Sequence, residues 1–237
     1  MFSAFRCILP EFHFNIGKKG RVVKMKKVLL LGDSIRMGYD QFVCELLKDK
    51  AEVVYPPDNG RFAQYTLRQL QDWKAQLHLA GDDVDLVHWN NGLWDVGHLG
   101  IGETGEAAAD TARCVAGYYT YEEENLTPPD FYAHMIRRVH NRIRTLFPRA
   151  EIIFAYTTPV LEDQIPSFLC RRNAEIRNYN EIAKTTLSEF GVQFNDLYTF
   201  AEKHTTHLHR DWVHYNEEGS RKIAEEIAEV ICRTLAL

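Results

Sequence analysis

The feature of this sequence that most constrains its fold is the alternation of short apolar segments with longer amphipathic ones. Five short segments are rich in branched and aromatic side chains, as strands buried on both faces require: residues 28–31, 53–55, 84–89, 152–156 and 192–194. Between them, apolar residues recur at helical spacing from about residue 36 onward and over residues 65–79, 130–147, 173–190 and 217–235. The pattern predicts strands that alternate with helices along the chain.

Strands separated by helices imply right-handed crossovers, and therefore a parallel sheet with helices on both faces. We predict an α/β protein, a three-layer α/β/α sandwich around a five-stranded sheet. The 237 residues suit one large domain, and no repeat or linker interrupts them. Residues 1–24 have neither helical nor strand periodicity, and Met25 stands directly before the first strand. We interpret 1–24 as an N-terminal extension and 25–237 as the domain.

Composition excludes several classes of protein. The net charge of -5 and the absence of a basic block argue against nucleic acid as a partner. No segment approaches the ~18 consecutive apolar residues of a membrane span. Five scattered cysteines without a C-x-x-C pair favour a reducing compartment, so we expect a cytoplasmic protein. Neither a metal-binding histidine pattern nor a nucleotide-binding glycine motif occurs, so no metal and no cofactor is expected.

Polar residues follow the predicted strands at the points where each strand ends. They are Ser34, Asn59-Gly60, Asn90-Asn91-Gly92 and Thr157-Thr158, and Asp211 with His214 precedes the last helix. In an open parallel sheet, ligands bind beyond the carboxyl ends of the strands. The sequence therefore predicts a site at this edge.

Ser34 and the pair Asp211/His214 carry the chemistry of this predicted site. Ser34 lies where a strand passes into a helix, whose N-terminal N–H groups can stabilise an oxyanion. A serine needs a base to become a nucleophile, and His214 held by Asp211 is such a base. The alternatives are that Ser34 is a plain N-cap, and that Asp211 and His214 are surface loop residues.

The stretches "GDSIRMG" and "DWVH" resemble the first and last motif blocks of the SGNH/GDSL hydrolases, esterases built on a flavodoxin-like α/β/α sandwich. The resemblance spans Met25–Leu237. It implies that Ser34 is the nucleophile, His214 the general base and Asp211 its orienting partner.

The middle blocks of that family concern the oxyanion hole. The resemblance implies that the backbone N–H groups of Ser34 and Gly60 contribute to it. The family's third block is Gly-x-Asn-Asp, whereas here the text is "HWNNGLWDVG", which places Trp94 at the asparagine. The side-chain amide then comes from Asn90, which we prefer, or from Asn91, or the hole has two backbone donors only.

The candidate substrate-binding residues are Asp33, Trp94, Thr158, Arg172 and Asn173, although Asn173 is equally well interpreted as a helix N-cap. Tryptophans in the site loops suit a sugar ring or an apolar acyl chain. We expect a serine esterase that hydrolyses short-chain acyl esters, acetyl esters of a small molecule or saccharide foremost. The alternatives are a lysophospholipase or thioesterase of the same family, and a catalytically idle carbohydrate-binding domain.

Overall fold

A computed structural model describes residues 24–99, 124–165 and 169–237 of the chain. The predicted extension, residues 1–24, lies outside the described residues except for Lys24, so its interpretation stays a prediction.

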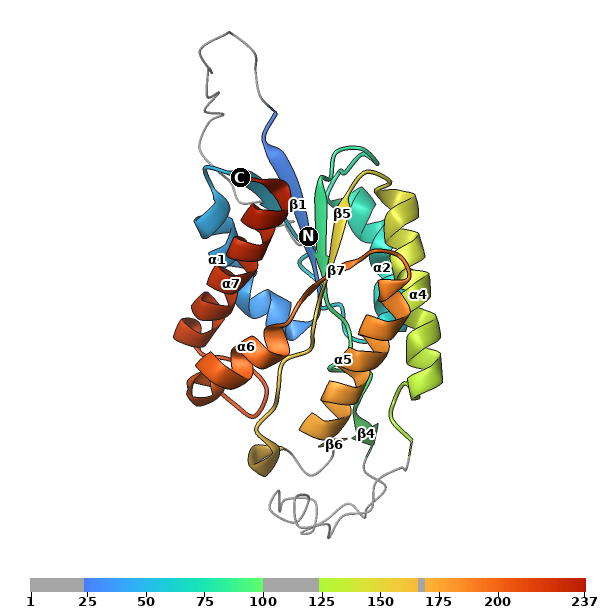
Figure 1. The fold of residues 1–237 in the computed structure, drawn as a ribbon, viewed down its shortest axis with the longest axis vertical. Helices are drawn as coiled ribbons and strands as arrows, with labels where there is room; N and C mark the ends of the chain where they lie inside the picture. Colours follow the sequence, from blue (N-terminus) through green and yellow to red (C-terminus); the bar gives the residue numbers. More distant parts are fainter. Residues whose placement is uncertain (1–23, 100–123, 166–168) are drawn as a thin grey trace.

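The centre of the fold is a sheet of five parallel strands (Figure 1). The strands are β1 (Lys26–Leu31), β2 (Ala51–Val54), β3 (Leu86–Trp89), β5 (Glu151–Ala155) and β7 (Gln193–Asn195). Their spatial order is β2-β1-β3-β5-β7. This is the flavodoxin-like order, which reverses direction at β1 and so opens a crevice beyond the ends of β1 and β3. The predicted strands and the predicted sheet are confirmed.

Helices cover both faces of this sheet. They are α1 (Ser34–Leu47), α2 (Ala63–Gln76), α4 (Pro129–Leu146), α5 (Asn173–Ser188), α6 (Leu197–His204) and α7 (Glu217–Leu235), with 3-10 turns at Glu162–Gln164 and Thr206–Leu208. Figure 1 shows α1, α6 and α7 on one side of the sheet and α2, α4 and α5 on the other. The three-layer sandwich is confirmed, and α6 is the helix that the sequence pattern missed.

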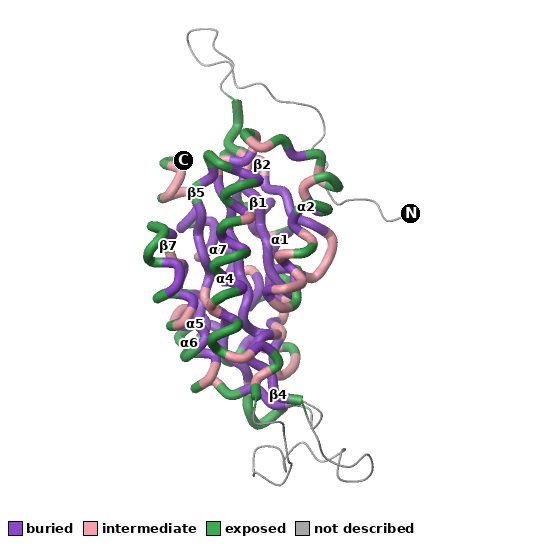
Figure 2. The backbone as a smooth tube through the Cα atoms, turned by 90° about the vertical axis from the view of Figure 1, so that its right-hand side faces the viewer, coloured by how far each residue is buried: buried purple, intermediate pink, exposed green. Residues whose placement is uncertain are grey.

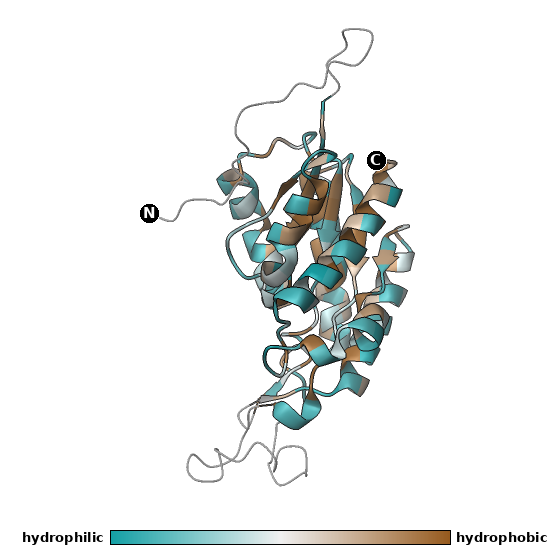
Figure 3. Cartoon of the chain, turned by 90° about the vertical axis from the view of Figure 1, so that its left-hand side faces the viewer, coloured by the Kyte–Doolittle hydropathy of each residue, from teal (hydrophilic) through white to brown (hydrophobic). Residues whose placement is uncertain are grey.

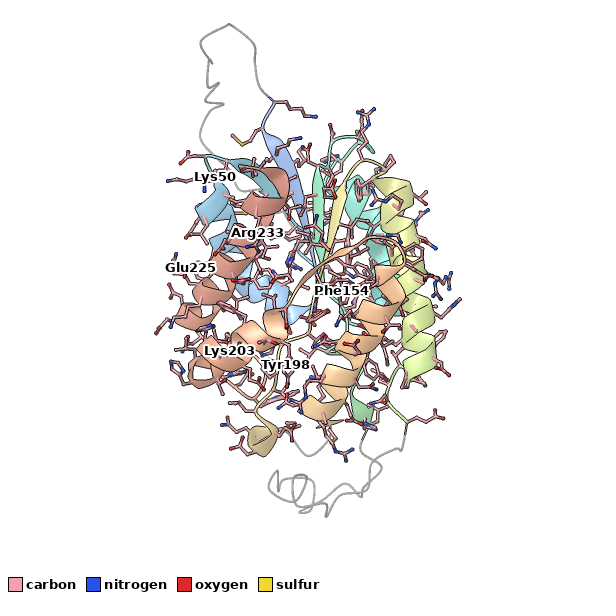
Figure 4. The ribbon with its side chains drawn as sticks, viewed as in Figure 1. Lys50, Phe154, Tyr198, Lys203, Glu225 and Arg233 are labelled. Carbon is pink, nitrogen blue, oxygen red and sulfur yellow. The ribbon has the colours of Figure 1, made fainter. Side chains whose placement is uncertain are left out.

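The core lies between these layers. In Figure 2 most of the residues in the central strands are buried, whereas α4, on the near side, exposes its outward face. Figure 3 shows the matching division of hydropathy, with hydrophobic residues on the strands and hydrophilic residues on the outer helix surfaces. Phe154 lies among the packed layers in Figure 4, and Lys50 and Glu225 project from the outside. Removal of this apolar surface from water supplies the main driving force for folding.

The register of the strands brings the predicted site loops together. Leu31 pairs with Trp89, Trp89 with Phe154, and Ala155 with Asn195, so the carboxyl ends of four strands finish at nearly the same level. Beyond that edge lies a two-stranded antiparallel sheet of β4 (His98–Leu99) and β6 (Leu169–Cys170). Among the described helices, none is both long and apolar enough to cross a membrane.

Candidate active site

The turn between β1 and α1 presents Ser34 toward the edge of the sheet. Asp33, not Ser34, is the N-cap of α1, and its Oδ1 accepts a hydrogen bond from Ile35 N at 2.9 Å. The alternative reading of Ser34 as a plain N-cap is therefore wrong. Because Asp33 satisfies the helix terminus, the hydroxyl of Ser34 is available for another partner, and Ser34 N has no hydrogen-bond partner among the described residues.

The loop before α7 is folded around the side chain of Asp211. Its Oδ1 accepts hydrogen bonds from Val213 N at 3.0 Å and from His214 N at 2.8 Å, an Asx-type turn. The carbonyl of His214 accepts in turn from Arg210 N at 2.7 Å. These bonds fix the backbone of His214 relative to Asp211, so the two residues are not independent surface groups.

The three side chains form one chain of hydrogen bonds. His214 Nδ1 lies 2.9 Å from Asp211 Oδ2, and His214 Nε2 lies 2.9 Å from Ser34 Oγ, although 180 residues separate the serine from the histidine. Burial opposes ionisation of Asp211, but the N–H groups of His214 and Val213 and the His214 ring outweigh it and lower the pKa of Asp211 to about 2. The Asp211 carboxylate is therefore ionised at any pH well above 2, and in this form it orients the His214 imidazole.

The loop after β2 packs directly against the turn between β1 and α1 that carries Ser34 (the Ser34 turn, residues 32–34). Gly60 N donates to Gly32 O at 2.9 Å, and Thr66 Oγ1 donates to Gly60 O. A Cβ atom on Gly60 would lie 2.6 Å from Gly32 O, so this approach requires glycine. The prediction placed Gly60 N in the oxyanion hole, but the structure uses that N–H to join the two loops.

Asn90 and Asn91 have different surroundings. Asn91 is fully buried, and its amide donates to Arg61 O and Thr66 Oγ1, both at 3.0 Å. Both amide hydrogens are thereby used. Asn90 Nδ2 donates only to Ala155 O, at 3.2 Å, which leaves its second hydrogen without a partner among the described residues. Asn90 lies beside the Ser34 turn: a Cβ atom built on Gly32 would be 3.6 Å from the Cβ of Asn90.

A cavity of about 270 Å³ opens beside Ser34 and His214. Its walls come from α1 and α7 and from residues 210–215 of the loop before α7, here called the histidine loop. Ile35, Met37 and Ile223 make part of the wall apolar, while Arg210 and Ser220 add polar groups. Pockets for drug-sized ligands span ~300–1,000 Å³, so this cavity suits a small group.

The remaining predicted substrate residues are dispersed. Asn173 is the first residue of α5, and its side chain bonds both Val160 N and Val160 O at 2.9 Å, so it holds the loop after β5. Arg172 occupies the N-cap position with its side chain 56% exposed, 3.8 Å from Glu175. Thr158 is buried and lines a small space together with Asp33.

Two residues acquire importance only in three dimensions. Arg171 is buried, and its guanidinium lies 5.0 Å from the ring centre of Trp212 and 6.0 Å from that of Trp94. Asp95 is completely buried and accepts a hydrogen bond from Ala63 N at 3.1 Å. The sequence pattern gave a substrate role to Trp94 but none to Arg171, because the pairing of β4 with β6 leaves no signal in either short segment.

Solved structures with the same fold are numerous. The lipase/acylhydrolase from Enterococcus faecalis superposes with a TM-score of 0.64 at 15% identity, covering 89% of this chain and 97% of that one. The acetyl xylan esterase AlAXEase superposes with a TM-score of 0.61 at 18% identity, covering 86% and 99%. At these identities the likeness concerns the fold.

Sequence similarity supports the family directly. The GDSL esterase/lipase WDL1 of Oryza sativa subsp. japonica is 25% identical over 114 residues, a match that covers 44% of each protein. Residues 30–222 match the GDSL-like Lipase/Acylhydrolase family. This segment contains Ser34, the pair Asn90-Asn91 and the histidine loop. The chain therefore belongs to the GDSL-like lipase/acylhydrolase family.

Proposed function

We propose that this protein is a serine esterase that removes short acyl groups, acetyl foremost, from a small polar alcohol such as a sugar, through an acyl-enzyme on Ser34. The observation that carries the proposal is the hydrogen-bonded chain Ser34–His214–Asp211, with 2.9 Å at each link. Nucleophile and base within ~2.6–3.2 Å, with the base oriented by a third group, is the arrangement that activates a serine.

The mechanism follows from this geometry. His214 Nε2 takes the proton of Ser34 Oγ as the oxygen attacks the ester carbonyl, and Asp211 stabilises the imidazolium that forms. The imidazolium then protonates the departing alcohol, which leaves an acyl group on Ser34. Water, deprotonated by His214, attacks that acyl group, and the acid and free enzyme are released.

Charge on the carbonyl oxygen requires hydrogen-bond donors beside Ser34. Ser34 N at the start of α1 is one, and the free hydrogen of the Asn90 amide is the second that the contacts favour. Asn91 is excluded from this role because both its amide hydrogens are already used. Gly60 N contributes only where its bond to Gly32 O is shared or released.

Two observations support a short acyl group and a polar alcohol. The cavity beside Ser34 and His214, about 270 Å³, is small for a long acyl chain. Trp94 and Trp212 both lie within 6.0 Å of the Arg171 guanidinium, and aromatic faces of this kind suit a sugar ring. A structural relative with the same fold is an acetyl xylan esterase.

The test is hydrolysis of 4-nitrophenyl acetate and 4-nitrophenyl octanoate by the wild type, Ser34→Ala and the control Ser188→Ala. Ser188 is an exposed serine whose hydroxyl bonds only Lys184 O. We expect acetate to be preferred, and Ser34→Ala to lower kcat by ~10⁴-fold or more with an unchanged Tm. Ser188→Ala retains full activity.

Other outcomes have distinct meanings. Preference for octanoate would replace the short-chain substrate by a lipid or thioester. Unchanged activity of Ser34→Ala would refute the nucleophile. If neither ester is turned over, labelling of the wild type by a fluorophosphonate, absent in Ser34→Ala, separates a narrow substrate requirement from a catalytically idle binder.

A further inference from the structure

Arg171 is a buried cation whose side chain forms no hydrogen bond with any residue that the structure describes. The residue is 6% exposed, yet none of its guanidinium N–H groups donates to another residue in the described part of the chain, and its Nε is enclosed without a partner. A guanidinium carries five N–H donors, and arginine is almost never buried unless it is paired. Its position therefore needs an explanation beyond packing.

The surroundings of Arg171 place it at the active site. Trp212 follows Asp211 directly in the histidine loop, and Trp94 lies in the loop after β3 that also carries Asn90 and Asn91. The Arg171 guanidinium therefore lies near both loops. It is also close enough to Asp33, the neighbour of Ser34, for the two charges to interact. The β4–β6 pairing, with His98 opposite Cys170, holds this arrangement.

The nearby carboxylates do not account for Arg171. No ion pair joins it to Asp33 or Asp95 among the residues described, so their charges act on it without contact. Burial raises the pKa of Asp95 to about 7, which leaves that group only partly charged near neutral pH. Burial lowers the pKa of Arg171 to about 10, so it is still a cation there.

We infer that Arg171 is a recognition residue for an anionic group, a carboxylate on the ester substrate, which its guanidinium binds between the rings of Trp94 and Trp212. The planar fork of arginine matches a carboxylate, and charge-assisted hydrogen bonds of this kind are the strong ones. This inference rests on the proposed esterase and narrows its substrate class to acidic esters, such as acylated acidic sugars.

The experiment compares acidic esters with neutral ones of the same shape. On the alcohol side the pair is 4-acetoxybenzoate and 4-acetoxybenzamide. On the acyl side it is 4-nitrophenyl hydrogen glutarate and its neutral methyl ester, with enzyme-free rates subtracted. The variants are Arg171→Gln, Arg171→Lys and the control Arg177→Gln. Arg177 also lies over a ring, 5.6 Å from that of Tyr198, and it does not line the cavity beside Ser34 and His214.

We expect the wild type to favour one acidic ester, and the favoured pair tells which side of the ester carries the carboxylate. Arg171→Gln should lower kcat/KM for that ester by ~10–100-fold, mainly through KM, with the neutral ester changed less than about twofold. Arg171→Lys should retain part of the preference, and Arg177→Gln all of it. Equal losses on acidic and neutral esters, or no preference in the wild type, would overturn the inference.

Binding without turnover keeps the test independent of the proposed reaction. Monomethyl glutarate, titrated into Ser34→Ala, should give a saturable change in tryptophan fluorescence, because two of the four tryptophans flank Arg171. Dimethyl glutarate should not, and the added substitution Arg171→Gln should abolish the response. A response that survives this substitution would contradict the inference, whereas an active Ser34→Ala would contradict only the proposed mechanism.

Discussion

Replacement of Asp95 by asparagine should make the protein more stable at neutral and alkaline pH while leaving it no more stable at pH 4. Asp95 is fully buried, its Oδ1 accepts from Ala63 N, and its Oδ2 has no partner among the described residues. Burial raises the pKa of this carboxyl from 3.8 to about 7, and the neighbouring Asp33 adds to the rise. Asparagine has nearly the same shape and stays neutral.

The sign and size of the effect follow from proton linkage. Between pH 3.8 and about 7 the folded protein keeps the Asp95 proton and the unfolded chain does not. Stability therefore falls as pH rises through this window, by ~1.4 kcal/mol for each pH unit. Over about three units the total reaches ~4 kcal/mol as an order of magnitude. The asparagine variant lacks this fall, but its buried NH₂ group costs ~1–3 kcal/mol at every pH.

The assay is urea unfolding of the wild type, Asp95→Asn and Asp82→Asn at pH 4.5, 6, 7 and 8. Asp82 is exposed, so it controls for the loss of one charge. We expect the stability of Asp95→Asn relative to the wild type to increase steadily with pH and to become favourable by pH 8. Parallel pH profiles for the wild type and Asp95→Asn would refute the reasoning, since they would mean that Asp95 is charged in the folded protein throughout.

The other predictions concern the catalytic geometry. Asn90→Ala should lower kcat by ~10²–10³-fold, as expected for an oxyanion donor, and cost only ~1 kcal/mol of stability through its one bond to Ala155 O; steady-state kinetics and urea unfolding measure the two quantities. Asn91→Ala should instead destabilise by several kcal/mol, because it strands the buried indole N–H of Trp89, which donates to Asn91 Oδ1 at 2.7 Å; a stable Asn91→Ala with low kcat would reverse the two roles. Asp211→Asn should lower kcat by ~10⁴-fold by favouring the wrong tautomer of His214. Because the pKa of Asp211 is about 2, no loss of wild-type activity between pH 4 and 9 should come from its protonation, and a wild-type pH–rate profile with a single ionisation on its acid side is the expected result.

Local patterns were sufficient for most of the fold. Strand segments of branched residues and helices with an apolar stripe are properties of a few consecutive residues, so β1, β3 and α7 were predicted, and α7 has the predicted bounds Glu217–Leu235. Helix α6, only eight residues long, was missed because a short segment gives too little periodicity. Helix α4, expected over residues 130–147, begins at Pro129, because proline is favoured in the first turn of a helix.

The candidate catalytic residues could also be predicted from the sequence, because a serine directly after a buried strand and an Asp–His pair before the last helix are recognised by residue type and order. Which side chains are free to act was decided by tertiary structure. Asn90 and Asn91 are neighbours with the same amide, yet only packing against Arg61 and Thr66 uses up the second one. Arg171 carries no local motif, and it becomes a site only because β4 and β6 bring it between two tryptophans. Sequence fixes which groups exist and how short segments fold, whereas contacts between distant segments determine which hydrogen bonds and charges remain unpaired at the site.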